Sequence, residues 1–239
     1  MKKYLFLILI ISFIFIQCNK ESNPIDNAND GSLLILGSIS NYNSNFNKIY
    51  ASGFPYSDSS LKFETEINAN GSFNLKIPVP SVNHLSSYTP FNWISIVYPN
   101  STFLIDSIHI ADSSLKYIRY DLFAQSSLPI TYALEINLAN ITTSGELAEV
   151  GDFFISYYYF SSSTKIEGYH KLKIVTQDST REFITEFNVN TKNGWNKLIT
   201  KLKSKTANKS VYEVIDIANE QGNWLIGAIG SFLNSVWKF

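Results

Sequence analysis

The chain has 239 residues, a formal net charge of −1 and a hydrophobic content of 45%. The near-balance of charge argues against a dedicated nucleic-acid-binding protein, and the hydrophobic content excludes disorder of the whole chain. The single cysteine excludes a disulfide framework and a multi-cysteine metal site. This length allows one large domain or two small ones.

The first 17 residues are organised like a secretory signal peptide. Lys2 and Lys3 precede an apolar segment that covers residues 4–16. A transmembrane helix needs about 20 apolar residues, so this segment is too short to span a membrane as part of the mature protein. The pattern therefore predicts a signal peptide over 1–17.

The only cysteine follows the apolar segment directly. The sequence Phe15-Ile16-Gln17-Cys18 resembles the lipobox of bacterial lipoproteins. The resemblance implies that Cys18 is lipidated, for example with palmitate, and becomes the mature N-terminus. It also implies an outer-membrane lipoprotein of the cell envelope that faces the periplasm or the surface. The alternative is a non-lipidated signal peptide in which the cysteine has no such role.

Residues 18–31 predict a polar tether. They include Pro24 and show no apolar periodicity. The acidic stretch 26–31 superficially matches a calcium-binding loop. However, Ala28 occupies a ligand position, and Gly37 stands where such a loop ends in glutamate. We therefore interpret the whole segment as a linker.

The following residues predict strands and turns. Strict alternation over 61–67 and 73–77 indicates two half-buried strands, and Asn70-Gly71 between them is typical of a hairpin with a type I′ turn. Further strands are predicted at 91–98, 102–110 and 115–123.

The stretch from about Leu34 to Pro78 resembles the carboxypeptidase regulatory-like, or prealbumin-like, β-sandwich. The matching segments are Gly37-Ser38-Ile39, Ile49-Tyr50-Ala51 and Ile67 to Leu75. The resemblance implies a non-catalytic accessory domain, which we place at 32–125.

A polar break at 125–129 predicts a second β domain over 126–239. Strands are expected at 130–139, 152–160 and 181–189. The strand 152–160 reads DFFISYYYF and is apolar on both faces, so both faces should be covered. We expect its face of Phe154, Tyr158 and Phe160 to pack against another part of the chain, such as the apolar segment 224–237.

Residues 195–220 fit two patterns. The spacing of their apolar residues is compatible with helices, but it also fits a hairpin of 197–203 and 211–217 around a turn at 207–209. The abundance of β-branched residues favours strands. A tyrosine-rich strand, the segment Thr164 to Gly168 and the motif Gly194-Trp195-Asn196 together resemble domains of uncharacterised secreted bacterial lipoproteins. That resemblance implies fold and location but no mechanism.

Aromatic residues are the candidate ligand-binding residues. Tyr157, Tyr158, Tyr159 and Trp195 could stack against a carbohydrate, or they could fill a β core. Six lysines between Lys192 and Lys209 could bind an anionic glycan or lipid head group, or they could protect an edge strand from aggregation.

Evidence for catalysis is weak. The sequence has no Gly-x-Ser-x-Gly motif and no phosphate-binding glycine loop, and nothing in it predicts a metal or a cofactor. Asp106, His109 and Asp112 form an acid–histidine cluster, but their spacing on a strand places His109 opposite both aspartates. Glu64 and Glu66 share a strand face, as the paired carboxylates of a glycosidase must.

The sequence therefore predicts an all-β protein with two antiparallel β-sandwich-like domains after a signal peptide and a tether. We expect a non-enzymatic binding or structural module that is held in the membrane through a lipid on Cys18 and has a protein or glycan partner, not nucleic acid. The alternatives are a carbohydrate-binding protein and a polysaccharide hydrolase that uses Glu64, Glu66 or Asp106. A hydrolase would need a concave site with convergent acids.

Overall fold

The computed structural model describes residues 26–27, 30–54, 58–87, 101–126, 131–137, 149–175, 180–216 and 222–227. Over these residues the fold is all-β, as predicted. Its strands are accompanied by two short 3-10 helices, η1 (Ser59–Leu61) and η2 (Val82–His84). None of the helices in this part of the chain is long and apolar enough to cross a membrane.

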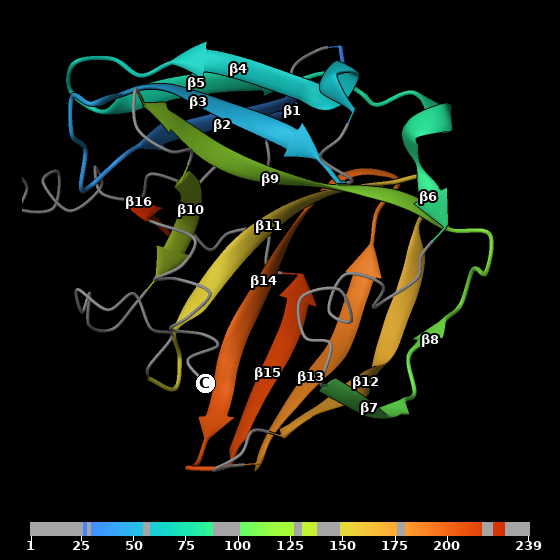
Figure 1. Ribbon diagram of the computed structural model, residues 1–239. Helices are drawn as coiled ribbons and strands as arrows, with labels where there is room; N and C mark the ends of the chain where they lie inside the picture. The colour runs from blue at the N-terminus through green and yellow to red at the C-terminus, as the bar shows by residue number, and fades with distance from the viewer. Residues whose placement is uncertain are drawn as a thin grey trace, which may run out of the picture.

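A small sheet of three strands forms one layer of the molecule. It contains β1 (Asp26–Asn27), β2 (Leu33–Ser38) and β5 (Ser72–Ile77) in the order β1-β2-β5. All neighbours in it are antiparallel. In Figure 1 this sheet lies at the upper end of the molecule.

A large sheet of 13 strands forms the rest of the described fold. Its strands are β3 (Phe46–Gly53), β4 (Lys62–Glu66), β6 (Ser86–Ser87), β7 (Ser101–Asp106), β8 (His109–Ile110), β9 (Lys116–Ser126), β10 (Thr131–Asn137), β11 (Phe153–Phe160), β12 (Thr164–Val175), β13 (Thr180–Thr191), β14 (Gly194–Lys205), β15 (Lys209–Asp216) and β16 (Asn223–Gly227). The main order is β4-β3-β9-β10-β11-β14-β15-β13-β12-β7, and β9 also pairs with β11. Apart from the parallel pair β13 and β15, these strands pair in antiparallel fashion.

The main core lies between the two sheets. Alternate residues of the small sheet point inward, so that Ile35, Leu75 and Ile77 are almost fully buried. They belong to one cluster with Ile118 of β9 and Ile155 of β11. Burial of apolar side chains from both layers is the dominant favourable contribution to such a sandwich.

A second core lies on the opposite face of the large sheet. On this face, strands β11, β14 and β15 present the residues that alternate with those of the main core: Phe160, Leu198 and Val214. These three residues cluster with Ile166 and Val189. The large sheet is therefore apolar on both faces near β11 and β14. Figure 1 shows β4, β3 and β9 lying across the upper ends of strands β11 to β12.

The two segments that the sequence separates, 32–125 and 126–239, share the large sheet. β9 pairs with β10 through Ala124 and Thr131, and it also pairs with β11. Farther along, β7 pairs with β12. The predicted boundary at 126 thus lies between strands that are hydrogen-bonded to each other.

The turn at Asn70-Gly71 is present, but the predicted hairpin is wrong. Gly71 N donates to Asn68 O at 2.8 Å, and Gly71 has a φ of +83°. A type I′ turn requires a positive φ at both central residues, here Asn70 and Gly71. Among the described residues only glycines have a positive φ, so the turn is not of type I′. The flanking strands also enter different sheets, because β4 pairs with β3 and β5 pairs with β2. The turn therefore carries the chain from one layer to the other.

Residues 194–216 form a hairpin of strands, as β-propensity favoured. Thr206 N donates to Lys209 O at 2.8 Å in the turn between β14 and β15. The interpretation of the lysine-rich segment as an edge strand is wrong, because β14 lies between β11 and β15. The predicted strand at 91–98 lies outside the described residues.

Candidate functional site

The predicted lipidation residue Cys18 lies outside the described residues, but the end of the predicted tether does not. Asp26 and Asn27 pair with the start of β2. Asp30 then accepts a hydrogen bond from Ser32 N at 3.1 Å and forms an ion pair with Lys76 at 2.6 Å. The C-terminal part of the segment 18–31 is therefore attached to the small sheet, and the tether prediction is too long at that end.

The four candidate ligand-binding aromatic residues lie on two different faces of the large sheet. Tyr157, Tyr159 and Trp195 point toward the main core, and the rings of Tyr159 and Trp195 meet edge to face at 5.3 Å. Tyr157 and Trp195 are only 7% and 5% exposed. Tyr158 points the other way and stacks on Phe160 at 5.7 Å. The four residues thus do not form one exposed platform.

The other face of β11 is partly covered by the same chain. Phe160 is buried, and it packs with Tyr158 against the second core, which includes Leu115 and Ile166. The covering residues come from other strands and loops of the large sheet. Trp224 of β16 belongs to the main core instead, against Phe73 at 5.0 Å. Burial of Phe160 is confirmed. Trp224 does not cover this face, and residues 228–237 of the expected covering segment lie outside the described residues.

The Gly194-Trp195-Asn196 motif builds a corner between β13 and β14. Asn196 is buried, and its Nδ2 donates to the carbonyls of Lys192 and Gly194, both at 2.8 Å. Its Oδ1 accepts from Lys192 N at 2.8 Å. Gly194 adopts a φ of +96°, which favours glycine. The motif therefore has a clear structural role.

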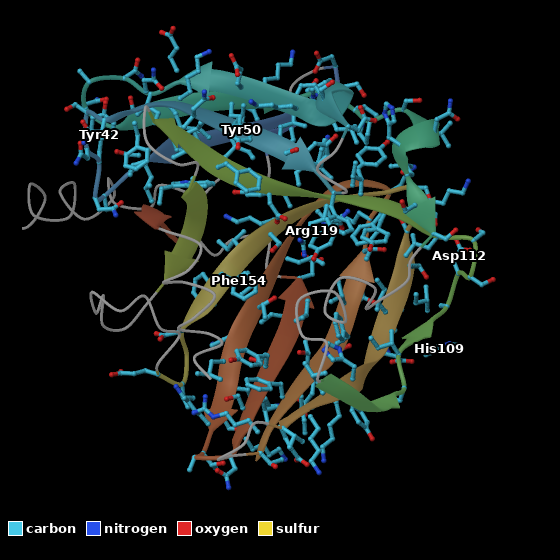
Figure 2. All side chains as sticks on the ribbon, viewed as in Figure 1. Tyr42, Tyr50, His109, Asp112, Arg119 and Phe154 are labelled. Carbon is cyan, nitrogen blue, oxygen red and sulfur yellow. The ribbon has the colours of Figure 1, made fainter. Side chains whose placement is uncertain are left out.

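The acid–histidine cluster is divided between elements. Asp106 ends β7, His109 begins β8, and Asp112 lies in the turn before β9. Asp112 accepts hydrogen bonds from the hydroxyls of Ser114 and Ser162 at 2.6 and 2.7 Å. These hydrogen bonds lower the pKa of Asp112, and the one from Ser114 contributes most. Figure 2 shows His109 and Asp112 well apart.

The glutamates of β4 lie in a charged strip. Lys48 Nζ lies 2.6 Å from Glu64 Oε1, and this hydrogen bond lowers the pKa of Glu64. A general acid needs a raised pKa instead. Lys62, on the same strand as Glu64, lies over the ring of Tyr50 at 4.1 Å.

A further set of polar and aromatic residues was not found from the sequence. We call it the β9 face; it comprises Tyr50, Arg119, Asp121, Phe123 and Tyr158. Tyr50 and Phe123 stack at 5.1 Å, and Arg119 Nη2 lies 2.8 Å from Asp121 Oδ2. Arg119 pairs in register with Tyr158 of β11. In Figure 2, Tyr50, Arg119 and Phe154 lie on the same side of the large sheet.

The ion pair of the β9 face is partly removed from solvent. The side chains of Arg119 and Asp121 are 21% and 17% exposed. Burial raises the pKa of Tyr158, and the nearby Arg119 guanidinium opposes that shift. Guanidinium and carboxylate groups flanked by aromatic rings can bind a polar, ring-shaped ligand such as a sugar. The charged residues Arg119 and Asp121 inside the aromatic segment 117–123 could have indicated this site from the sequence. Tyr50 could not, because it comes from a strand distant in the sequence.

Two buried polar atoms of the main core, Tyr120 Oη and Trp195 Nε1, have no hydrogen-bond partner among the described residues. Their rings lie 5.5 Å apart. Within the described ranges, no group of three or more histidine, cysteine, aspartate or glutamate residues could hold a metal ion.

Comparison of the chain with models of known protein families, with characterised proteins and with solved structures finds no match.

Proposed function

We propose that this protein is a lipid-anchored component of the bacterial cell envelope that acts as a non-enzymatic binding or structural module. The observation that carries the proposal is the position of Cys18, which is the only cysteine and directly follows the apolar segment 4–16. Two or more acyl chains give stable membrane anchoring, because each buried CH₂ contributes about 0.8 kcal/mol. The all-β body that follows the tether is compatible with such a module.

Replacement of the cysteine tests the anchor. The Cys18→Ala variant should appear in the soluble fraction after a high-salt wash and should incorporate no labelled palmitate. A Ser22→Ala variant is the matched control, and it should stay with the membranes. Membrane association of Cys18→Ala equal to that of the control would refute the proposal.

The charge environment of Glu64 argues against its use as the general acid of a hydrolase. The hydrogen bond from Lys48 holds the pKa of Glu64 below its usual range. Glu64 is therefore ionised at neutral pH. An ionised carboxylate cannot protonate a glycosidic oxygen.

The β9 face favours carbohydrate binding as a second candidate function. Its half-buried Arg119–Asp121 pair offers donors and acceptors beside the Tyr50 and Phe123 rings. Under this proposal, Arg119→Gln should weaken binding of the protein to envelope polysaccharide in a pull-down experiment at least several-fold.

Arg181→Gln on β13 is the matched control for the loss of one guanidinium, and it should leave binding unchanged. Circular dichroism should show that both variants are folded. Equal binding by both variants, or no binding by the unmodified protein, would refute the carbohydrate proposal without affecting the anchor.

A further inference from the structure

The chain that connects the proposed anchor to the body is short. Only residues 19–25 lie between Cys18 and the first residue of β1, because Asp26 already pairs with Leu34. An extended chain covers at most about 3.6 Å per residue, so the eight steps from Cys18 to Asp26 can reach no more than about 29 Å. The ion pair between Asp30 and Lys76 fixes the chain to the same sheet a few residues later.

The attachment point lies at one end of the molecule. β1 is the edge strand of the small sheet, whereas the turn between β14 and β15 lies at the opposite end (Figure 1). Trp195 belongs to the main core between the two sheets, and β14 continues from it for ten residues to Lys205. That strand length is about 33 Å, which already exceeds the reach of the tether.

The outer side of the small sheet has the surface chemistry that a membrane can accept. Leu36 and Asn74 are register partners on this side, and Leu36 is 58% exposed. Val79 and Val82, in the chain that follows β5, are also exposed large hydrophobic residues. The Asp30 and Lys76 charges of this sheet neutralise one another.

We propose that the outer side of the small sheet faces the lipid bilayer and that the β14–β15 turn points away from it. This orientation rests on the proposed lipidation of Cys18. This orientation is the reverse of the one that electrostatic attraction alone would favour, because Lys205 and Lys209 are exposed at the distal turn. Anionic head groups attract each such lysine by about 1 kcal/mol near the surface, so a freely rotating body would turn its basic end toward the membrane.

Fluorescence quenching on the full-length lipidated protein tests the orientation. Single labels are placed at Asn74→Cys, on the outer side of the small sheet, and at Lys205→Cys, at the distal turn. The sulfur of Cys18 is consumed by the thioether to the lipid, so it does not react with the dye. The protein is inserted into vesicles that carry a nitroxide on the lipid head group.

The dye at position 74 should be quenched several-fold more strongly than the dye at position 205. Insertion of about 20 Gly and Ser residues after Glu21 adds a flexible coil and should remove most of this difference. Equal quenching at both positions, or stronger quenching at 205, in the protein without the insertion would overturn the orientation. Absence of both labelled proteins from the vesicles would instead refute the lipid anchor.

Discussion

His170 is a buried titratable residue, and its burial predicts how the stability of the protein depends on pH. Its side chain lies in β12 beside the Phe187 ring at 5.7 Å, and burial lowers its pKa from 6.5 to about 4. The unfolded chain therefore binds more protons than the folded chain between these two values. Stability is fully present above pH 6.5 and is lost as the pH falls toward 4.

The loss of unfolding free energy across that window should approach about 3 kcal/mol. Urea denaturation at pH 7.5, 6 and 5 measures the first part of this loss, which should reach about 2 kcal/mol at pH 5. A His170→Leu variant should show a much flatter profile over the same range, because the carboxylates titrate mainly at lower pH. A variant with the same slope as the unmodified protein would show that another group is responsible.

Asn196 gives a second prediction at this scale. Its side chain satisfies three backbone groups of the corner between β13 and β14 while it is itself buried. Asn196→Ala should destabilise the protein by about 2–3 kcal/mol, since buried backbone groups lose their partners. Asn190→Ala, at an exposed position of β13, should change the melting temperature little. Similar melting temperatures for the two variants would contradict the structural role.

At the scale of single elements, strand positions could be predicted and strand partners could not. Alternation over 181–189 and the apolar run 152–160 both correspond to observed strands, β13 and β11. The alternating segments 61–67 and 73–77 are also strands, but they face each other across the sandwich instead of pairing. A period of two defines which side of a strand is buried, and it carries no information about the neighbour.

The turn between β4 and β5 provides a test at this scale. Gly71 has a φ of +83°, and a Cβ there would lie 2.9 Å from Tyr42 Cβ and 3.1 Å from the Ile39 carbonyl oxygen. Gly71→Val should therefore cost about 1–3 kcal/mol of stability from backbone strain, with a further loss from the contacts.

Gly151→Val is the matched control, because Gly151 also has a positive φ but a Cβ would meet nothing within 4 Å. Thermal unfolding should show a larger loss for Gly71→Val than for Gly151→Val. Equal losses would mean that the space around the layer-crossing turn does not matter.

At the scale of the whole molecule, the large sheet joins segments that sequence patterns treat separately. β7 pairs with β12 although about 60 residues lie between them. The β9 face arises in the same way, because Tyr50 of β3 pairs with Phe123 and Tyr158 of β11 pairs with Arg119. No local sequence pattern predicts such a site. The aromatic cluster that the sequence does show, Tyr157 to Tyr159 with Trp195, is divided between the two cores.

The proposed anchor and the proposed orientation both require a mature N-terminus at Cys18. Mass spectrometry of the protein purified from membranes measures it directly. We predict a chain that begins at Cys18 and carries the added mass of a diacylglyceryl group and an amide-linked acyl chain. A mature protein that begins at another residue, or an unmodified Cys18, would contradict the proposed function and the membrane-facing orientation together.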